Sequence, residues 1–379
     1  MRKHLPATKK TWFRPLSSLY GAAVKLRNML FDQGVIKSHT YPIPLICVGN
    51  LSVGGSGKTP HVELLLRKLT PKHKIAVISR GYKRSTKGLI IATPHSTAKE
   101  IGDEPKQIVS KFPGILMVLD GNRRRAMEYL LNLPKCERPD IVIMDDGFQH
   151  RYVRPSFSII LSDYNNPLIS DSLLPEGTLR EPASSRYRAD AVIVTKCPQG
   201  LQPIDTRIAR RDLALYPDQY LFFSHIVYGD TLRIQDLAKK VDPPPDISQE
   251  KIDHPLSINH QTPVIALSGI AKPELFQNYL RQHYNYIEEI NYGDHHQFCS
   301  QDIKHIHDTY HRVQQQNDKQ VIIITTEKDA VRLADILESF DKEVVSALYY
   351  LPIEVKILRG WEDSFNRMLD KAVKLTPYS

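Results

Sequence analysis

The stretch Gly54-Gly55-Ser56-Gly57-Lys58-Thr59 decides how this chain folds. It follows an apolar run at 44–49, which predicts a buried strand, and it precedes a helical pattern near 60–69. A strand, a glycine-rich turn and a helix in this order are typical of a phosphate-binding loop, whose backbone N–H groups point at phosphate oxygens. We therefore expect a nucleoside triphosphate site, with Lys58 at the β- and γ-phosphates and Thr59 on Mg²⁺.

The expected nucleotide contacts extend over the whole loop. The usual pattern begins with a glycine, and here that position is Ser52, so that Gly54 and Gly55 supply the backbone freedom instead. The residues predicted to bind the nucleotide are Ser52, Val53, Gly54, Gly55, Ser56, Gly57, Lys58 and Thr59. A glycine-rich turn without a ligand is the alternative, and the position between strand and helix disfavours it.

Outward from the loop, short apolar runs alternate with helical patterns. Strands are expected near 74–79, 115–119, 140–145, 157–162 and 191–195. This alternation predicts an α/β fold of the P-loop NTPase type, a parallel sheet flanked by helices, and it resumes at 263 as a second, smaller α/β lobe. The expected divisions are an N-terminal basic amphipathic helix in 1–40, a P-loop core in 41–225, a connector in 226–262 and the C-terminal lobe in 263–379.

Two aspartates follow one of the expected strands directly. The apolar run at 141–144 leads into Asp145 and Asp146. A carboxylate at the carboxyl end of a strand next to the phosphate loop is where P-loop proteins hold Mg²⁺, directly or through water. The alternative is that both residues only cap a turn.

Two other polar clusters are candidates for catalysis. Asp103 and Glu104 precede a proline, which is compatible both with a helix start and with a carboxylate that accepts the proton of an acceptor hydroxyl. His295 and His296 are adjacent, so their side chains point in different directions and a shared metal is not expected. One histidine turned towards the nucleotide lobe and a surface helix cap both stay open. The rigid, charged loop at 174–182 is a candidate wall of an acceptor site.

The positive charge is concentrated at the N-terminus. Lys and Arg total 51 against 42 Asp and Glu, a formal charge of +9, and the first 40 residues hold eight of these bases and one acid, Asp32. The body of the chain is therefore nearly neutral, and a nucleic acid partner is not expected.

The same N-terminal segment has a helical apolar stripe. It consists of Trp12, Leu16, Leu19, Ala23, Leu26 and Leu30, and Gly34 is a suitable end. We expect a helix at 12–33 that lies on an anionic membrane surface, because charged residues interrupt it too often for it to span a bilayer. The alternative is that the stripe packs against the lobe that contains the phosphate loop.

The cysteines give the expected compartment. Cys47, Cys136, Cys197 and Cys299 lie far apart, without the spacing of a zinc site or a disulfide framework. The basic start is not followed by a hydrophobic signal core with a cleavage site. Both observations favour a reducing cytoplasm.

The chain resembles the tetraacyldisaccharide 4′-kinase family over nearly its whole length and in the same motif order. The motifs that carry the resemblance are GlyAsnLeuSerValGlyGlySerGlyLysThrPro (49–60), SerArgGlyTyr (79–82), GlyAspGluPro (102–105), AspAspGlyPheGlnHis (145–150), LeuProGluGlyThrLeuArgGluPro (174–182), LeuSerGlyIleAlaLysPro (267–273), AspHisHis (294–296) and ThrGluLysAspAlaValArgLeu (326–333). Of these, AspAspGlyPheGlnHis is among the most specific.

The resemblance implies an enzyme of lipid A biosynthesis in Gram-negative bacteria. Such an enzyme transfers the γ-phosphate of ATP, with Mg²⁺, to the 4′-hydroxyl of a tetraacylated glucosamine disaccharide 1-phosphate. It implies a peripheral position on the cytoplasmic face of the inner membrane. No protein partner is evident from the sequence.

The resemblance also implies roles for single residues. Asp103 matches the catalytic base, and His295, rather than His296, is expected to pair with it; Lys58 completes the catalytic set. The expected metal residues are Thr59, Glu104, Asp145 and Asp146, and the tentative acceptor contacts are Gln149, His150 and Arg180.

Two functions from other classes stay open at this point. One is a P-loop GTPase-like switch or metal-insertion chaperone, for which the histidine pair is the only support. The residues ThrThrGluLysAspAla at 325–330 have the wrong order for a guanine-selecting loop and do not indicate GTP. The other is a non-catalytic peripheral membrane module, which would not need the phosphate loop.

Overall fold

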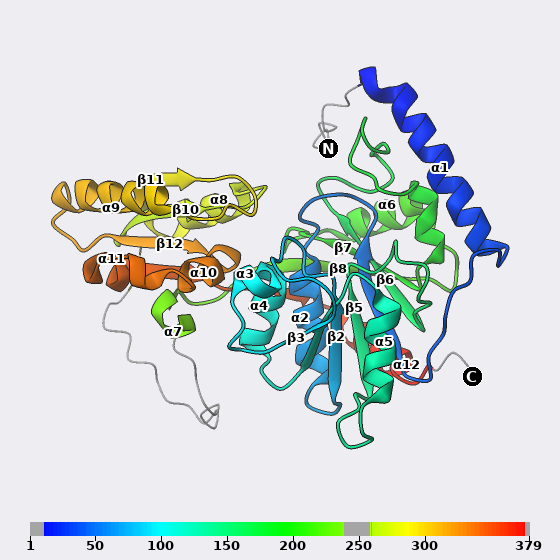
Figure 1. The fold of residues 1–379 in the computed structure, drawn as a ribbon. Coiled ribbons are helices and arrows are strands. Elements are labelled where there is room, and N and C mark those ends of the chain that lie inside the picture. Colours follow the sequence, from blue (N-terminus) through cyan, green and yellow to red (C-terminus); the bar gives the residue numbers. More distant parts are fainter. Residues whose placement is uncertain (1–10, 239–257, 259, 376–379) are drawn as a thin grey trace.

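The larger lobe is built on a nine-stranded, mainly parallel sheet. The computed structural model describes residues 11–238, 258 and 260–375. In spatial order the strands are β14 (Ile353–Ile357), β8 (Tyr220–Tyr228), β7 (Ala191–Thr195), β6 (Phe157–Asp163), β1 (Leu45–Asn50), β5 (Ile141–Asp145), β2 (Ile75–Ser79), β4 (Leu116–Leu119) and β3 (Ile90–Ala92). Only the outermost pairs, β14 with β8 and β3 with β4, are antiparallel. The predicted α/β fold with a parallel sheet is confirmed (Figure 1).

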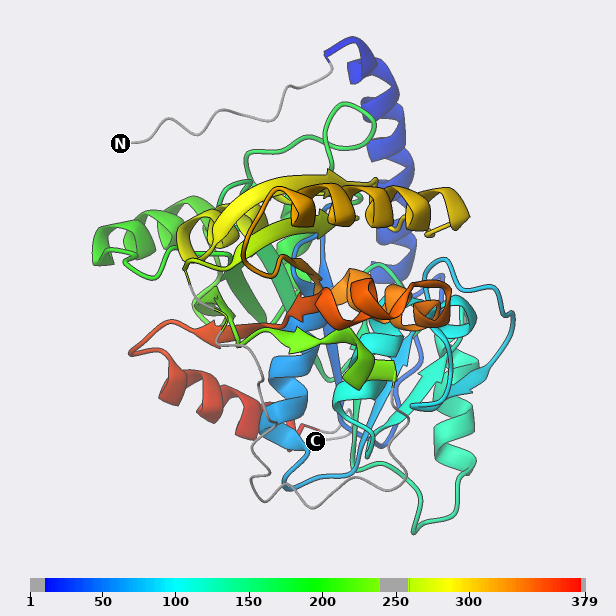
Figure 2. The same ribbon diagram turned by 90° about the vertical axis from the view of Figure 1, so that its left-hand side faces the viewer.

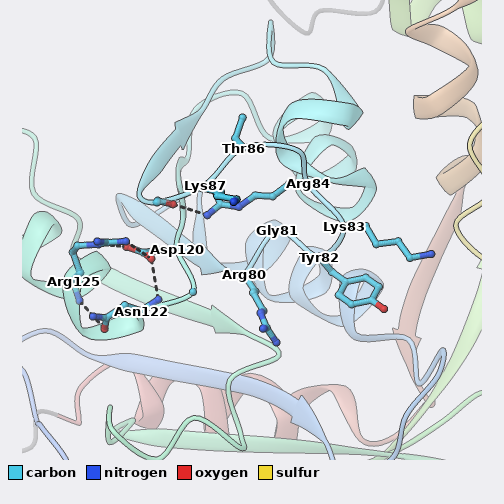
Figure 3. Close-up of a pocket in the computed structure, with 12 residues that line it drawn as sticks. Arg80, Gly81, Tyr82, Lys83, Arg84, Thr86, Lys87, Asp120, Asn122 and Arg125 are labelled. Atoms are coloured by element: carbon cyan, nitrogen blue, oxygen red, sulfur yellow. Dashed lines mark hydrogen bonds and ion pairs between the residues drawn. The ribbon is translucent and has the colours of Figure 1, made fainter.

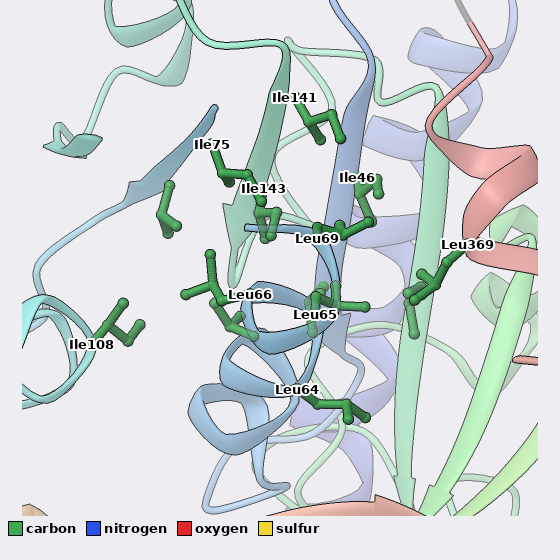
Figure 4. Close-up of a cluster of buried hydrophobic side chains, with 14 of the residues drawn as sticks. Ile46, Leu64, Leu65, Leu66, Leu69, Ile75, Ile108, Ile141, Ile143 and Leu369 are labelled. Carbon is green, nitrogen blue, oxygen red and sulfur yellow. The ribbon is translucent and has the colours of Figure 1, made fainter. Parts of the chain in front are cut away.

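Helices cover both faces of this sheet. The helices α2 (Lys58–Leu69), α4 (Asp103–Lys111) and α12 (Glu362–Ala372) pack on one face, and α5 (Arg123–Asn132) and α6 (Pro203–Leu213) pack on the other. Strand β1 is buried on both faces of the sheet, which explains its apolar sequence. Ile46 and Val48 join the core on one face, and Leu45 and Cys47 join the core on the other. Figure 4 shows Ile46 among the leucines of α2.

The second lobe is a five-stranded sheet with its own helices. Its strands, in spatial order, are β11 (Asn285–Asn291), β10 (Pro263–Ser268), β12 (Ile322–Thr326), β13 (Leu348–Leu351) and β9 (Leu232–Arg233). Its helices are α7 (Ile234–Ala238), α8 (Glu274–His283), α9 (Ser300–Gln315), α10 (Glu327–Ala334) and α11 (Lys342–Ala347). Helix α10 packs against α4 and the short α3 (Ala98–Ile101), so the second lobe lies beside the sheet end that carries α3 and α4 (Figures 1 and 2).

The lobe boundaries differ from those expected from the sequence. Strand β14 and helix α12, expected in the C-terminal lobe of 263–379, belong to the larger lobe, where Val355 and Phe365 are buried in its core. Within the expected connector of 226–262, β8 extends to Tyr228, and β9 and α7 join the second lobe; residues 239–257 and 259 lie outside the described residues. Strand-helix alternation is the same in both lobes, so it does not reveal to which sheet a strand returns.

The predicted N-terminal helix is present as α1 (Arg14–Asp32), preceded by a short 3-10 turn at Thr11–Phe13. Pro15 stands in its first turn, and Gly34, with φ +72°, follows its end. Helix α1 runs along the outer side of the larger lobe, away from the second lobe (Figure 1). None of the helices in the described ranges has the length and apolar character needed to cross a membrane.

Candidate active site

The phosphate loop connects β1 to α2 at the carboxyl edge of the larger sheet. Gly54 and Gly57 adopt φ values of +100° and +85°, which favour glycine, and the Ser56 N–H donates to the Gly54 carbonyl at 2.9 Å. The Lys58 ammonium lies 3.4 Å from Asn50 Oδ1 and 3.6 Å from Asp146 Oδ1. Lys58 is the first residue of α2, and its ammonium group faces Asp146 after the end of β5.

The beginning of the loop contacts protein instead of open space. The Val53 N–H donates to the Thr178 carbonyl at 2.8 Å, and Ser52 forms an isolated bridge with Leu179. The Val53 N–H, assigned to the nucleotide from the sequence, is therefore already used. The loop at 174–182, predicted to line an acceptor site, lies directly beside the phosphate loop.

Two residues at the carboxyl end of β7, Thr195 and Lys196, hold the phosphate loop from the other side, and neither was predicted from the sequence. The Thr195 hydroxyl donates to the Ser56 carbonyl at 3.2 Å, and the Lys196 ammonium donates to the Gly55 carbonyl at 2.6 Å. Lys196 also forms an ion pair with Asp163 at 2.8 Å. Because C=O and N–H of a trans peptide point in opposite directions, holding the Ser56 carbonyl turns the next N–H to the other side. The signal in the sequence was a Thr-Lys pair at the carboxyl end of an apolar strand.

Asp145 lies at the end of β5, next to β1, and presents an oxygen without a partner. Its Oδ2 accepts from the Ser79 hydroxyl at 3.1 Å, while Oδ1 is buried and unpaired, as is the Ser56 hydroxyl in the phosphate loop. Burial first, and then the charges of Glu104 and Asp146, raise the pKa of Asp145 to about 7. A divalent cation bound at Asp145 would satisfy its unpaired oxygen and keep the carboxyl ionised, so this residue fits Mg²⁺.

Asp146 is held in place by two cations. It adopts φ +46°, and its carboxylate is 3.2 Å from the Arg180 guanidinium and close to Lys58. Burial would raise its pKa, but the charges of Lys58 and Arg180 lower it below the usual value. Among the residues that the structure describes, no three His, Cys, Asp or Glu side chains form a metal site by themselves. A cation here would therefore need nucleotide oxygens as further ligands, as in other P-loop proteins.

Asp103 and His295 meet across the two lobes. Asp103 begins α4 in the larger lobe, and its Oδ2 lies 3.0 Å from Nδ1 of His295, in the loop after β11. Arg332 of α10 lies 3.6 Å from the same carboxylate oxygen. Although burial would raise the pKa of Asp103, the hydrogen bond from His295 and the charges of Arg332 and Lys328 lower it below the usual value. Asp103 is therefore ionised at neutral pH and available as a proton acceptor.

The neighbouring histidine has a different partner. His296 Nε2 lies 2.8 Å from Asp302, at the start of α9, and points away from Asp103. The geometry thus selects His295, as expected from the sequence, and the two histidines do not share a partner.

Helix α10 contributes two cations, Lys328 and Arg332, whose roles were not predicted from the sequence. Lys328 Nζ lies 3.0 Å from His295 Nε2 and 3.9 Å from Glu104, and Arg332 donates to the His296 carbonyl. Both residues belong to the motif at 326–333. The overlapping residues 325–330 have the wrong order for a guanine-selecting loop. Their position shows that this motif fixes the His295 loop against the carboxylates of the larger lobe.

A cavity of about 500 Å³, which we call the acceptor cavity, brings the tentative acceptor residues together. It is lined by Tyr20, Val24, Arg27, Arg80, Gly121, Arg123, Asp146, Gln149, His150, Arg180 and Glu181. Gln149 Nε2 donates to the Asn50 carbonyl at 2.7 Å, which ties this cavity to the end of β1. Burial, and then the charges of Arg123, Arg27 and Arg80, lower the pKa of His150 to about 4, so its ring is neutral at pH 7.

Comparisons with known proteins decide the family. The family described as tetraacyldisaccharide-1-P 4′-kinase matches residues 9–374. The chain belongs to this family. Proteins named tetraacyldisaccharide 4′-kinase are 46% identical in Porphyromonas gingivalis, over 93% of this chain and 94% of that protein, and 41% identical in Flavobacterium psychrophilum, over 91% and 92%.

A solved structure of the family has the same fold. The Aquifex aeolicus member, crystallised in complex with ATP, aligns with a TM-score of 0.69 at 27% identity, over 96% of this chain and 99% of that one. These comparisons confirm the family, the fold and the kinase activity that were predicted for this chain from its sequence. The roles of single site residues stay predictions.

Proposed function

We propose that the chain transfers the γ-phosphate of ATP to the 4′-hydroxyl of a tetraacyldisaccharide 1-phosphate, a step of lipid A biosynthesis. The relatives' names and the ATP complex of the Aquifex aeolicus protein support the two substrates. The observation that carries the proposal for this chain is the Asp103–His295 contact beside the phosphate loop. It places an ionised carboxylate next to Glu104, whose charge acts on Asp145 at the end of β5.

The donor side of the reaction uses the phosphate loop. The free N–H groups at the N-terminus of α2 and the Lys58 ammonium would bind the β- and γ-phosphates. Thr59, Asp145 and Asp146 would hold Mg²⁺, with Glu104 nearby; when bound, the cation neutralises charge on the transferred phosphoryl group. Lys58 and Arg180 position Asp146 for this task, as their contacts with its carboxylate indicate.

The acceptor side uses the interface between the lobes. Asp103 would accept the proton of the 4′-hydroxyl, and His295 and Arg332 would hold its carboxylate in place and ionised. A weakly basic carboxylate is sufficient because phosphoryl transfer passes through a loose transition state, in which the proton leaves late. The acceptor cavity, with Gln149, His150 and Arg180 in its wall, would hold the sugar.

The N-terminal helix would bring this cavity to the lipid. Its inner face contacts the active-site loops: the Tyr20 hydroxyl donates to the Arg180 carbonyl at 2.8 Å, and Arg27 donates to the Gln149 carbonyl at 2.9 Å. Its outer face exposes the apolar stripe, with Leu19 70% and Leu16 55% accessible. The stripe thus does not pack against the kinase lobe, the alternative considered from the sequence.

An exposed apolar stripe on a basic helix is suited to the interface of an anionic bilayer. We therefore place α1 on the cytoplasmic face of the inner membrane, with the acceptor cavity behind it. The lipid would then reach the cavity along Tyr20, Val24 and Arg27, which line it from α1. Neither nucleic acid nor a protein partner is part of this proposal.

Replacing the exposed leucines Leu16, Leu19 and Leu26 with serine is expected to abolish most of the binding to anionic vesicles. The loss follows from the removal of apolar area that would lie in the bilayer interface. Flotation with vesicles of phosphatidylglycerol and phosphatidylethanolamine measures it, at low and high salt. As a control, Ile204 and Ile208, exposed on α6, are changed to serine. A folded triple variant that floats as well as wild type would show that another surface binds the membrane.

The whole proposal is tested by nucleotide turnover with and without an acylated disaccharide 1-phosphate. We expect ATP consumption to require the acceptor and the new phosphate to appear at its 4′ position in the ³¹P NMR spectrum. Acceptor-independent turnover with a preference for GTP would support the switch or chaperone function instead. No turnover with either nucleotide would support the membrane module.

A further inference from the structure

His61 is a buried polar residue on α2 that has none of the roles proposed above. Its side chain is only 3% exposed, and Val62 and Leu65 on the same helix belong to the apolar core. A buried ring with two nitrogens costs free energy unless both are hydrogen-bonded, whereas a leucine at this position would pack without that requirement. The partners of the two nitrogens therefore indicate what the histidine does.

Both ring nitrogens of His61 have a partner. Nδ1 lies 2.7 Å from the carbonyl oxygen of Gly57 in the phosphate loop, and Nε2 lies 2.9 Å from the hydroxyl of Ser224 on β8. A carbonyl oxygen only accepts, so Nδ1 carries the proton and donates the hydrogen bond. Burial lowers the pKa of His61 to about 4, and Nε2 of the neutral ring therefore accepts from the Ser224 hydroxyl.

Ser224 attaches the ring to the larger sheet. It is completely buried, and its strand, β8, is paired on both sides, with β14 and with β7. The Ser224 carbonyl accepts the Cys197 N–H at 2.9 Å, and Ser224 lies opposite Ile357 of β14. His61 thus connects the phosphate loop to a strand whose backbone is fixed.

The Gly57 peptide is the point where the phosphate loop needs this support. Gly57, with φ +85°, is the N-cap of α2 and has no side chain that could cap the helix. Its carbonyl accepts both the ring N–H of His61 and, at 3.2 Å, the backbone N–H of the same residue. Because the C=O and N–H of a trans peptide point in opposite directions, a held Gly57 carbonyl turns the Lys58 N–H away from His61.

The carbonyls of Gly55 and Ser56 are held in the same way, by the two donors at the carboxyl end of β7. With the Gly57 carbonyl on His61, three consecutive carbonyls of the loop point at protein donors. The backbone N–H groups of Gly57 and Lys58 therefore face the other side. Successive N–H groups turned to one side in this way form an anion-binding concavity.

We propose that His61 is a positioning residue of the phosphate loop, which holds the Lys58 N–H in the direction in which it binds a phosphate oxygen of the nucleotide. Ser224 acts through His61 by fixing the ring. This inference rests on the proposed function for its ligand, ATP, and adds two residues outside the glycine-rich motif. A loop that is already in its binding conformation pays no ordering cost, so loss of the bond to Gly57 should weaken nucleotide binding more than the chemical step.

The test compares two substitutions that differ chiefly in the donor. Leucine and asparagine have the same branched shape, and an asparagine at position 61 can donate to the Gly57 carbonyl through Nδ2. His61→Leu is expected to raise the Kd for ATP with Mg²⁺ about tenfold, as the weakening of one hydrogen bond to a charged phosphate implies. His61→Asn is expected to stay within about threefold of wild type. Calorimetry without acceptor measures both values.

Steady-state kinetics show whether the effect is confined to the nucleotide. Neither His61 nor Ser224 lines the acceptor cavity or the neighbouring cavity of about 660 Å³, which Figure 3 shows between the loop after β2 and the start of α5. For His61→Leu we therefore expect the KM for ATP to rise with the Kd, and the KM for the acceptor and kcat to change less than about threefold. Ser224→Ala should raise the KM for ATP about twofold and add nothing further in a double variant with His61→Leu.

Val62→Ala is the control for a loss of packing on the same helix, because Val62 is fully buried and apolar. It is expected to lower the melting temperature and to leave the Kd for ATP within about twofold of wild type. Equal Kd values for the leucine and asparagine variants would show that the donor to Gly57 is unimportant. A His61→Leu variant that melts earlier but binds ATP as well as wild type would make His61 a core residue only. Either result would overturn the proposal.

A measurement on the wild-type protein is independent of activity. Nitrogen-15 NMR of protein labelled at histidine shows which ring nitrogen is protonated, and comparison with His61→Asn identifies the signal. We expect the proton of His61 on Nδ1. A proton on Nε2 would leave the Gly57 carbonyl without this donor and would overturn the proposal. Wild-type protein with the proton on Nδ1 that bound no ATP would instead refute the proposed function, and the positioning role with it.

Discussion

Lys58→Ala is expected to lower the rate of phosphoryl transfer by a factor of about 100 or more at saturating ATP. The ammonium group would stabilise charge that develops on the transferred phosphoryl group, and the removal of one such preorganised donor typically costs 10²–10³ in rate. The measurement is initial rate with saturating acceptor, with nucleotide binding followed separately by calorimetry. A variant that retained more than about a tenth of the wild-type rate would contradict the assignment of the phosphate loop.

The fold of the Lys58 variant should remain intact. Lys58 is the first residue of α2, and a cation at a helix N-terminus opposes the helix dipole, so its removal does not weaken the helix. Its contacts with Asn50 and Asp146 are long, at 3.4 and 3.6 Å. Lys68→Ala, near the C-terminal end of the same helix, is the matched control and is expected to leave the rate within about twofold.

Asp103→Ala is expected to lower kcat by a factor of about 10²–10⁴ with little change in the KM for ATP. A general base contributes this much when it acts in the transition state, and an interaction made only there changes kcat more than nucleotide binding. The pKa of Asp103 lies below the usual value. Protonation of this base should therefore lower wild-type activity only when the pH is below the pKa of an ordinary carboxyl. Steady-state kinetics measure the loss in the variant, and between pH 5 and 8 they should show no fall in wild-type activity through protonation of this base.

The histidine partner gives the comparison that distinguishes a pair from two separate residues. His295→Ala is expected to cause a smaller loss of kcat, and the double variant with Asp103→Ala should resemble Asp103→Ala alone. His296→Ala serves as the control, because His296 contacts Asp302 instead. Strictly additive losses from Asp103→Ala and His295→Ala would show that the two side chains act independently.

The parts of the site that could be predicted from the sequence are those in which chemistry and local structure coincide. The phosphate loop and the aspartates after β5 belong to this group, because a glycine-rich turn or a carboxylate directly after an apolar strand must lie at the carboxyl edge of a parallel sheet. Helix α1 was predictable for the same reason, since the spacing of its apolar residues determines one face.

The choice between equivalent candidates required the tertiary structure. Asp103 and His295 are separated by 192 positions, and neither local propensity nor spacing distinguishes His295 from His296. The left-handed backbone of His295, with φ +57°, and the contacts of Lys328 and Arg332 determine which ring faces the carboxylate. Lys196 was missed because its contact with the phosphate loop crosses β6, and the sequence contains no information on strand order.

By itself, then, the sequence determined the α/β class, the phosphate loop and the helical periodicity of α1, all of which arise from interactions within short stretches of chain. The tertiary structure decided that β14 and α12 return to the larger sheet, and that the leucine stripe of α1 stays exposed while its Tyr20 and Arg27 face the active site. These outcomes depend on which distant apolar surfaces are buried together. That burial is non-directional and leaves no periodic signal in the sequence to identify the partner.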